Sequence, residues 1–192
     1  MSAPNPNSFS EMENGSKAQW DHIAASINHY NEGFVDRIVE TLQVLSEDAG
    51  GFAVDRLEHS LQSATRAYRD NKDTEFVVCA LVHDIGDMLA PYNHDQYAAA
   101  ILQPFVSEAH HWMVSHHGVF QGYYFFEYVG LDKNMRDKFA GHEHYDLCAD
   151  FCHNYDQNSF DPNYDSMSLA DFEPALREVL GHGPKQSIYK AG

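Results

Sequence analysis

Cationic side chains are scarce in this sequence of 192 residues, which has 12 lysines and arginines against 29 aspartates and glutamates and a formal net charge of −17. Nucleic acids and anionic membrane surfaces bind proteins through clustered lysines and arginines. The shortage therefore argues against both as general partners. The sequence also lacks a basic N-terminus followed by an apolar run, and no apolar stretch approaches the ~20 residues of a membrane helix.

Cysteine is also rare, with Cys79, Cys148 and Cys152 as the only three. The odd count and the loose spacing give no disulfide framework, which favours a reducing compartment. Together with the absent leader pattern, this predicts a cytoplasmic protein with no membrane partner.

Strand patterns are missing, because no alternation of apolar and polar residues persists along the chain. Apolar residues recur instead at three- and four-residue spacing, as at Phe34, Ile38, Leu42 and Leu45. The expected fold is all-α, a single helical bundle of roughly seven to nine helices. Helices are expected at about 18–45, 57–67, 74–89, 94–100, 106–116, 143–152 and 168–180. The polar segment 1–16 and the end 183–192 are expected to be tails of one domain, 17–182.

Histidine is abundant, with 13 residues. Several histidines and two aspartates lie on or beside apolar segments, where unpaired polar groups would be costly to bury. A metal relieves that cost, and mixed imidazole and carboxylate ligands favour first-row transition metals. Six such ligands exceed what one catalytic ion takes while it keeps open positions, so two ions are predicted. The candidate ligands are His59, His83, Asp84, His94, His117 and Asp156.

A single histidine in an apolar helix is more often a hydrogen-bonded packing residue than a ligand, and a His-Asp dipeptide occurs by chance. The order and spacing of the whole set carry the interpretation. On the motifs "LEHSLQSA", "ALVHDIGD", "NHDQYAAAIL" and "NYDQ", residues 50–160 resemble the HD-domain superfamily. Within it, the chain is most similar to the mixed-valent di-iron oxygenases, namely myo-inositol oxygenase and the 2-amino-1-hydroxyethylphosphonate oxygenases.

The resemblance implies how the ligands divide between two irons. Asp84 would bridge them, His59, His83 and Asp156 would hold one, and His94 and His117 the other. His117 is preferred to its neighbour His116 because it directly precedes "GVFQGYY". His116 would then be a neighbour that either contacts the metal ligands or lies at the surface. His110-His111 are interpreted as surface or packing residues. A second metal site at His142 and His144 is a less favoured alternative.

The substrate pocket departs from the phosphonate oxygenases. Their tyrosine and glutamate before the first histidine correspond to Ala49 and Phe52, their phosphonate-binding lysine to Gln121, and an arginine to His153. Loss of both cations removes the charge partners that a phosphonate needs. Candidate pocket residues are therefore Phe52, Gln121 and His153. Tyr124 is a fourth candidate, from an aromatic cluster most of which is expected to be core packing.

Asp87 stands where myo-inositol oxygenase has a lysine, three residues after the His-Asp pair. With Asp84, it is a candidate catalytic residue that could pair with a cationic or polyhydroxylated substrate. It could equally be a surface acid, or orient a metal-bound histidine.

Three functions remain open. The first is a di-iron oxygenase, in which iron and O₂ oxidise a small hydroxyl-bearing substrate other than a phosphonate. The second is an HD phosphohydrolase of a small phosphoester or nucleotide, with manganese or zinc also conceivable and with Arg56, Arg66 or Lys138 as phosphate contacts. The third is a metal-bound sensor without turnover. We favour the oxygenase, with the hydrolase second.

Overall fold

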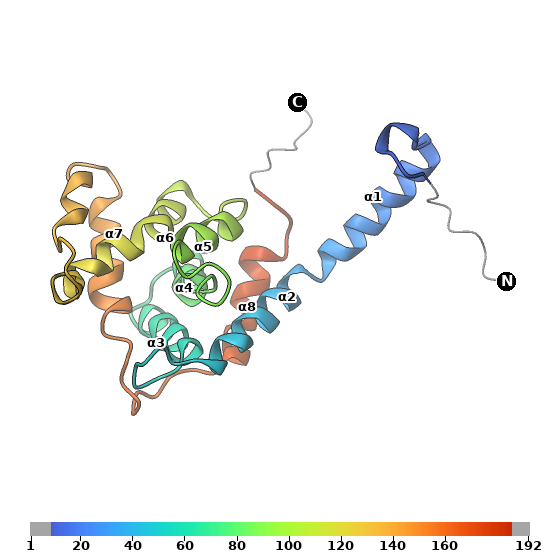
Figure 1. Ribbon diagram of the computed structural model, residues 1–192. Helices are drawn as coiled ribbons and strands as arrows, with labels where there is room; N and C mark the ends of the chain where they lie inside the picture. Colours follow the sequence, from blue (N-terminus) through green and yellow to red (C-terminus); the bar gives the residue numbers. More distant parts are fainter. Residues whose placement is uncertain (1–8, 186–192) are drawn as a thin grey trace.

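Eight α-helices make up most of residues 9–185, which the computed structural model describes, and that range contains no strand (Figure 1). The all-α fold expected from the sequence is thus confirmed, with a helix number inside the expected range. Residues 1–8 and 186–192, which hold much of the two expected tails, lie outside the described residues.

The helices begin where the sequence offers caps. Asp55, Asp73 and Ser107 each accept a hydrogen bond from a first-turn amide, and Ser168 forms a capping box with Asp171. The helices are α1 (Lys17–Glu32), α2 (Phe34–Val44), α3 (Arg56–Arg69), α4 (Thr74–Val82), α5 (His94–Leu102), α6 (Glu108–Gln121), α7 (Tyr145–Phe151) and α8 (Leu169–Leu180).

Helix α4 forms the centre of the bundle. Its residues from Phe76 to Val82 are all buried, and it packs against α3, α6 and α8. A fully buried Val, Leu or Phe side chain stabilises a fold by roughly 1.5–3 kcal/mol, so this apolar helix anchors the elements around it. Its C-terminal end is therefore a rigid place from which to project polar side chains.

The sequence predicted one helix over 74–89, and this was wrong. Helix α4 ends at Val82, and residues 83–89 form successive turns, with Ile85 N–H donating to Val82 and Asp87 N–H to Asp84. Gly86 in this turn lies against the start of α5, where a Cβ atom would lie 2.8 Å from the His94 carbonyl oxygen. The His-Asp pair consequently sits in a turn beside the start of α5.

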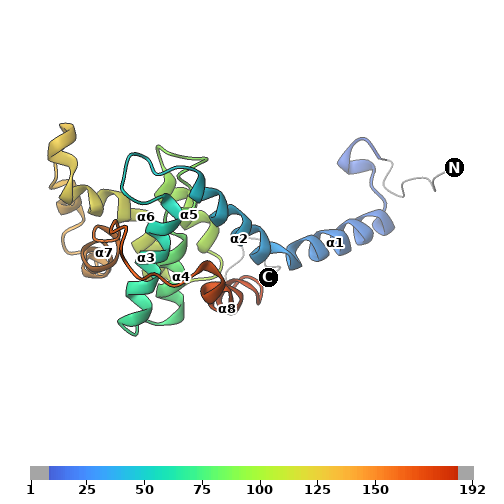
Figure 2. The same cartoon turned by 90° about the horizontal axis from the view of Figure 1, so that it is seen from below.

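Helix α1 projects from the bundle, as both views show (Figures 1 and 2). None of its residues is buried, and Gly33 separates it from α2, where one helix had been expected over 18–45. Between residues 9 and 185, no helix has both the length and the apolar character that crossing a bilayer requires.

Candidate metal centre

Five segments meet at the end of α4. They bring together all six predicted ligands: His59 from α3, His83 and Asp84 from the turn after α4, His94 from the start of α5, His117 from α6, and Asp156 from a π-helical turn at Cys152–Asp156. That they bind metal remains a prediction.

The π-helical turn explains how Asp156 reaches the site. It continues α7, and the amide of Gln157 donates to the carbonyl of Cys152, five residues earlier, at 3.0 Å. The wider turn buries Tyr155 and Asp156 side by side. Single π turns in α-helices are frequent at functional sites, and this one directs a carboxylate into the protein interior.

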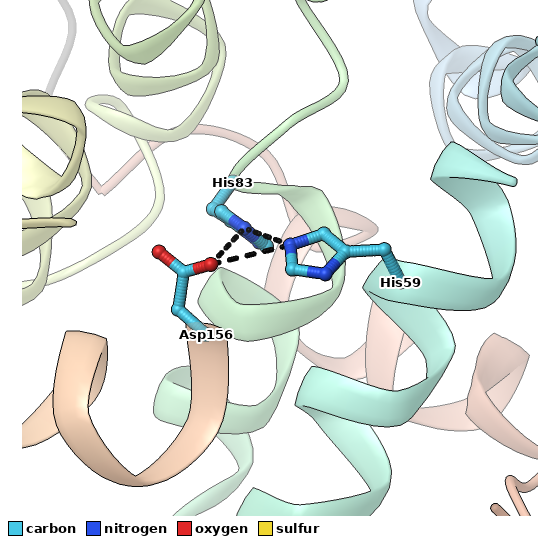
Figure 3. A group of neighbouring side chains, drawn as sticks. All are labelled: His59, His83 and Asp156. Carbon is cyan, nitrogen blue, oxygen red and sulfur yellow. Dashed lines mark hydrogen bonds and ion pairs between the residues drawn. The ribbon is translucent and has the colours of Figure 1, made fainter. Parts of the chain in front are cut away.

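One half of the site consists of His59, His83 and Asp156 (Figure 3). The two Nε2 atoms are 3.2 Å apart, and Asp156 Oδ1 lies 3.2 Å from His59 Nε2 and 3.7 Å from His83 Nε2. Asp84 closes this half, because its Oδ2 atom is 3.4 Å from each of the same nitrogens.

The other half consists of His94 and His117. Their Nε2 atoms are also 3.2 Å apart, and Asp84 Oδ1 lies 3.4 Å from the first and 3.2 Å from the second. The two oxygens of Asp84 thus face two different histidine pairs. This is the arrangement in which a carboxylate can bridge two ions.

The outer nitrogens of three histidines are anchored to the main chain. His59 Nδ1 donates to Ser159 O at 3.0 Å, His83 Nδ1 to Ala80 O at 2.8 Å and His117 Nδ1 to Val114 O at 2.7 Å. A carbonyl only accepts hydrogen bonds, so each Nδ1 carries the proton and each neutral ring presents an Nε2 lone pair to the centre.

The chemistry of these donors fits a cation. Two facing lone pairs repel and two facing N–H groups would collide, so without an ion one ring of each pair must be protonated at Nε2 to donate to the other, whereas a cation binds both lone pairs at once. An ion ~2.1 Å from two nitrogens that are 3.2 Å apart would subtend an angle of about 100°, between tetrahedral and octahedral values. Among the described residues, the buried Asp156 Oδ2 atom also has no hydrogen-bond partner, which a cation would supply.

Without an ion, the carboxylates favour the protonated form of the histidines. Burial lowers the pKa of His59 and His83, but contact with Asp156 and Asp84 outweighs it and leaves both pKa values raised above 6.5. The pKa of His117 is raised as well, because the Asp84 contact exceeds the effect of burial. Metal binding at this site would therefore displace protons.

The same contacts lower the pKa values of the two carboxylates. Burial raises the pKa of Asp84, but His83 and His117 outweigh it and hold that pKa well below its usual value. For Asp156, burial is outweighed by His59 and His83, which lower its pKa to about 2. Both groups are therefore ionised at neutral pH, as metal ligands need to be.

A cavity of about 490 Å³ opens onto the centre and is largely apolar. Three predicted pocket residues, Phe52, Gln121 and Tyr124, line it. His153 does not, because it lies on the exposed side of the π turn, where its Nδ1 atom is 3.0 Å from the Tyr124 hydroxyl. The sequence missed Phe160, whose ring stacks between Phe52 and His59.

Gln121 also touches a candidate ligand directly. Its Nε2 atom donates to Asp156 Oδ1 at 2.6 Å. The residue that stands in place of a phosphonate-binding lysine is therefore engaged with a carboxylate of the site.

Asp87 borders the cavity but contacts the outer side of the centre. Its Oδ1 atom lies 3.3 Å from His94 Nδ1, and its Oδ2 atom forms an ion pair with Arg56. Burial and the charge of Asp84 raise the pKa of Asp87. Of the interpretations left open by the sequence, orientation of a histidine agrees best with this position, and a catalytic role remains a prediction.

Three further histidines are held by contacts outside the centre. His110 Nδ1 is 2.7 Å from Glu75 Oε1. His116 and His142 stack on Trp112, with ring centroids 4.1 and 4.3 Å away. Within residues 9–185, the three overlapping clusters able to hold an ion all belong to the centre described above, the third being Asp84, Asp87 and His94.

Comparison with known proteins adds no relative: no protein-family model matches the chain, and no curated protein is significantly similar to it.

Proposed function

We propose that this chain is an HD-domain enzyme with a dinuclear metal site, and that it is a di-iron oxygenase acting on a small hydroxyl-bearing substrate. The observation that carries the proposal is the position of Asp84, whose two oxygens face two separate pairs of histidine nitrogens. Bound iron would supply the activation of O₂ and the redox chemistry.

The residues of the chain would hold and orient the reactants. Asp84 would fix the spacing of the two ions, and the main-chain anchors of His59, His83 and His117 would keep their Nε2 lone pairs directed inward. The apolar cavity wall would exclude water from the reacting carbon.

The scarcity of free cations around the cavity supports oxidation over hydrolysis. Arg56 is the single lysine or arginine among the described residues that line it, and its guanidinium already pairs with Asp87 and Asp48. Arg66, expected as a possible phosphate contact, instead stacks on Tyr164 and donates to Asn158 O.

The pocket also favours a substrate without a phosphonate. Gln121 occupies the position of one cation and donates to Asp156, while His153, in the position of the other, lies outside the cavity lining. An anionic head group would therefore find little charge compensation in the cavity wall.

Phosphohydrolase activity is the second candidate, and the position of Arg56 favours it. A guanidinium in the cavity wall could bind a phosphate if its two ion pairs opened. The same metal site would then activate water for attack on phosphorus.

The test is to purify the chain anaerobically, measure iron per chain, and record the EPR spectrum after partial oxidation. We expect about two irons, a mixed-valent signal, and O₂ consumption with one member of a panel of small polyols and amino alcohols. Asp84→Asn should lose the signal, and Asp146→Asn, an exposed aspartate on α7, should keep it. Zinc or manganese with O₂-independent phosphatase activity would overturn the oxygenase proposal.

A further inference from the structure

The four histidines of the centre are not held alike. The outer nitrogens of His59, His83 and His117 are hydrogen-bonded to main-chain carbonyls, which helices and turns keep in place. His94 has an ion-pair contact instead, at 3.3 Å from Asp87 Oδ1, and its side chain is the most exposed of the four, at 25%. Its orientation thus depends on where a carboxylate points.

The Asp87 carboxylate is itself held by Arg56. The Arg56 Nη1 atom contacts Asp87 Oδ2, leaving Oδ1 directed at the His94 ring. Both partners are largely shielded, with 11% of the Asp87 side chain and 27% of the Arg56 side chain exposed. Partly buried charge pairs of this kind resist solvent screening better than surface pairs.

Arg56 is fixed in turn by the loop before α3. Its Nε atom lies 3.4 Å from Asp48 Oδ2, and its backbone amide donates to Asp48 O at 3.2 Å. The guanidinium also packs on the main chain at Gly50, where a Cβ atom would lie 2.7 Å from Nη2 and where φ is +57°. A chain of contacts therefore runs from this loop through Arg56 and Asp87 to His94.

We propose that Arg56 and Asp87 are positioning residues that hold the His94 ring, and that they set the affinity of one of the two ions, the one bound by His94 and His117. The inference rests on the proposed dinuclear site. Loss of Arg56 should leave the affinity of the ion at His59, His83 and Asp156 unchanged. Main-chain carbonyls, and not Asp87, orient both of the histidines that bind that ion.

Loss of Arg56 has a specific physical consequence. The Asp87 carboxylate would then lie beside Asp84 without a cation to balance it, and like charges would drive it to rotate towards solvent. His94 would lose its orienting partner. Removal of such partners typically weakens metal affinity 10–100-fold.

The experiment titrates chelator-stripped protein with Mn²⁺ and follows the free ion by EPR. The wild type should bind two ions. Arg56→Gln should bind one with unchanged affinity and the other about 10–100-fold more weakly, while Arg56→Lys, which keeps the charge, should restore part of the loss. His94→Ala identifies the affected ion, because it should remove the same one altogether.

Arg69→Gln is the matched control, since Arg69 lies on the same helix but pairs with the exposed Asp165. It should bind both ions as the wild type does. The inference is overturned if Arg56→Gln binds two ions with wild-type affinity, or if it weakens both ions equally. A wild type that binds fewer than two ions overturns the dinuclear site itself, and the proposed function with it, so the two failures are distinguishable.

Discussion

The Nε2 atoms of His59 and His83 face each other at 3.2 Å, although each ring already donates its Nδ1 proton to a main-chain carbonyl. The Nε2 atoms of two buried histidines thus converge, and a buried carboxylate oxygen of Asp156 lies beside them. With both rings neutral this arrangement is unfavourable, and either a proton between the two nitrogens or a bound cation relieves it.

Removal of a ligand from this half should lower the metal content. His59→Ala and Asp156→Ala each delete one of the three donors that meet around one ion, so we expect metal per chain to fall from about two to about one or less. Elemental analysis of the purified variants measures this. His29→Ala is the control, because this exposed histidine lies on α1, away from the centre, and pairs with Glu32. Unchanged metal content in His59→Ala would show that the ligand assignment is wrong.

Metal should also stabilise the fold. An ion present at 100 times its dissociation constant adds about 2.7 kcal/mol to the free energy of unfolding, which for a domain of this size raises Tm by about 5–10 °C. Scanning calorimetry of chelator-treated protein with and without added Mn²⁺ measures the shift. Asp84→Asn lacks the bridging charge and should show little or no shift; an equal rise in that variant would place the ion elsewhere.

The fold class and the nominated residues were accessible from the sequence, because helical periodicity and ligand order are local or nearly local signals. Apolar spacing over 34–45 marks a helix directly. The six histidines and aspartates could be nominated because burying so many polar groups needs a common partner. Whether that partner is a metal is what the metal measurements decide.

Other features depend on contacts that no local pattern encodes. The end of α4 at Val82 and the approach of Gly86 to α5 are two such features, and no residue pattern marks the π turn that directs Asp156. Arg56 was considered only as a phosphate contact, because its partner Asp87 lies 31 residues away. The sequence thus indicates which side chains take part, whereas long-range packing decides how they are held.

Acid should weaken the fold through Glu75. Burial raises the pKa of this carboxyl, but hydrogen bonds from Ser107, His110 and Lys185 outweigh it and lower the pKa to about 2. A lowered folded-state pKa contributes stability that is fully present above about 4.5, the unfolded value, and is lost as the pH falls towards about 2.

Glu75→Gln tests this contribution by urea unfolding. We expect the variant to be less stable than the wild type at pH 7, by on the order of 1 kcal/mol, and the difference to shrink at pH 3. The exposed Glu178→Gln on α8 serves as the control and should unfold like the wild type at both pH values. A difference that grows on acidification would contradict the assigned role of Glu75.

Two glycines beside the centre should respond to alanine in opposite ways. In Gly86→Ala the new Cβ would lie 2.8 Å from the His94 carbonyl oxygen and 2.9 Å from Tyr97 Cβ, so the start of α5 must shift. We expect a loss of about 1–3 kcal/mol in unfolding free energy and weaker binding of the ion at His94.

In Gly118→Ala the new Cβ would meet nothing closer than 3.4 Å, at Asp95, and the substitution replaces a glycine within α6. It should therefore stabilise the fold by roughly 0.5–1 kcal/mol and leave both ions bound. Urea unfolding and Mn²⁺ titration of the two variants side by side distinguish these effects, and equal behaviour would show that the Gly86 contact does not position His94.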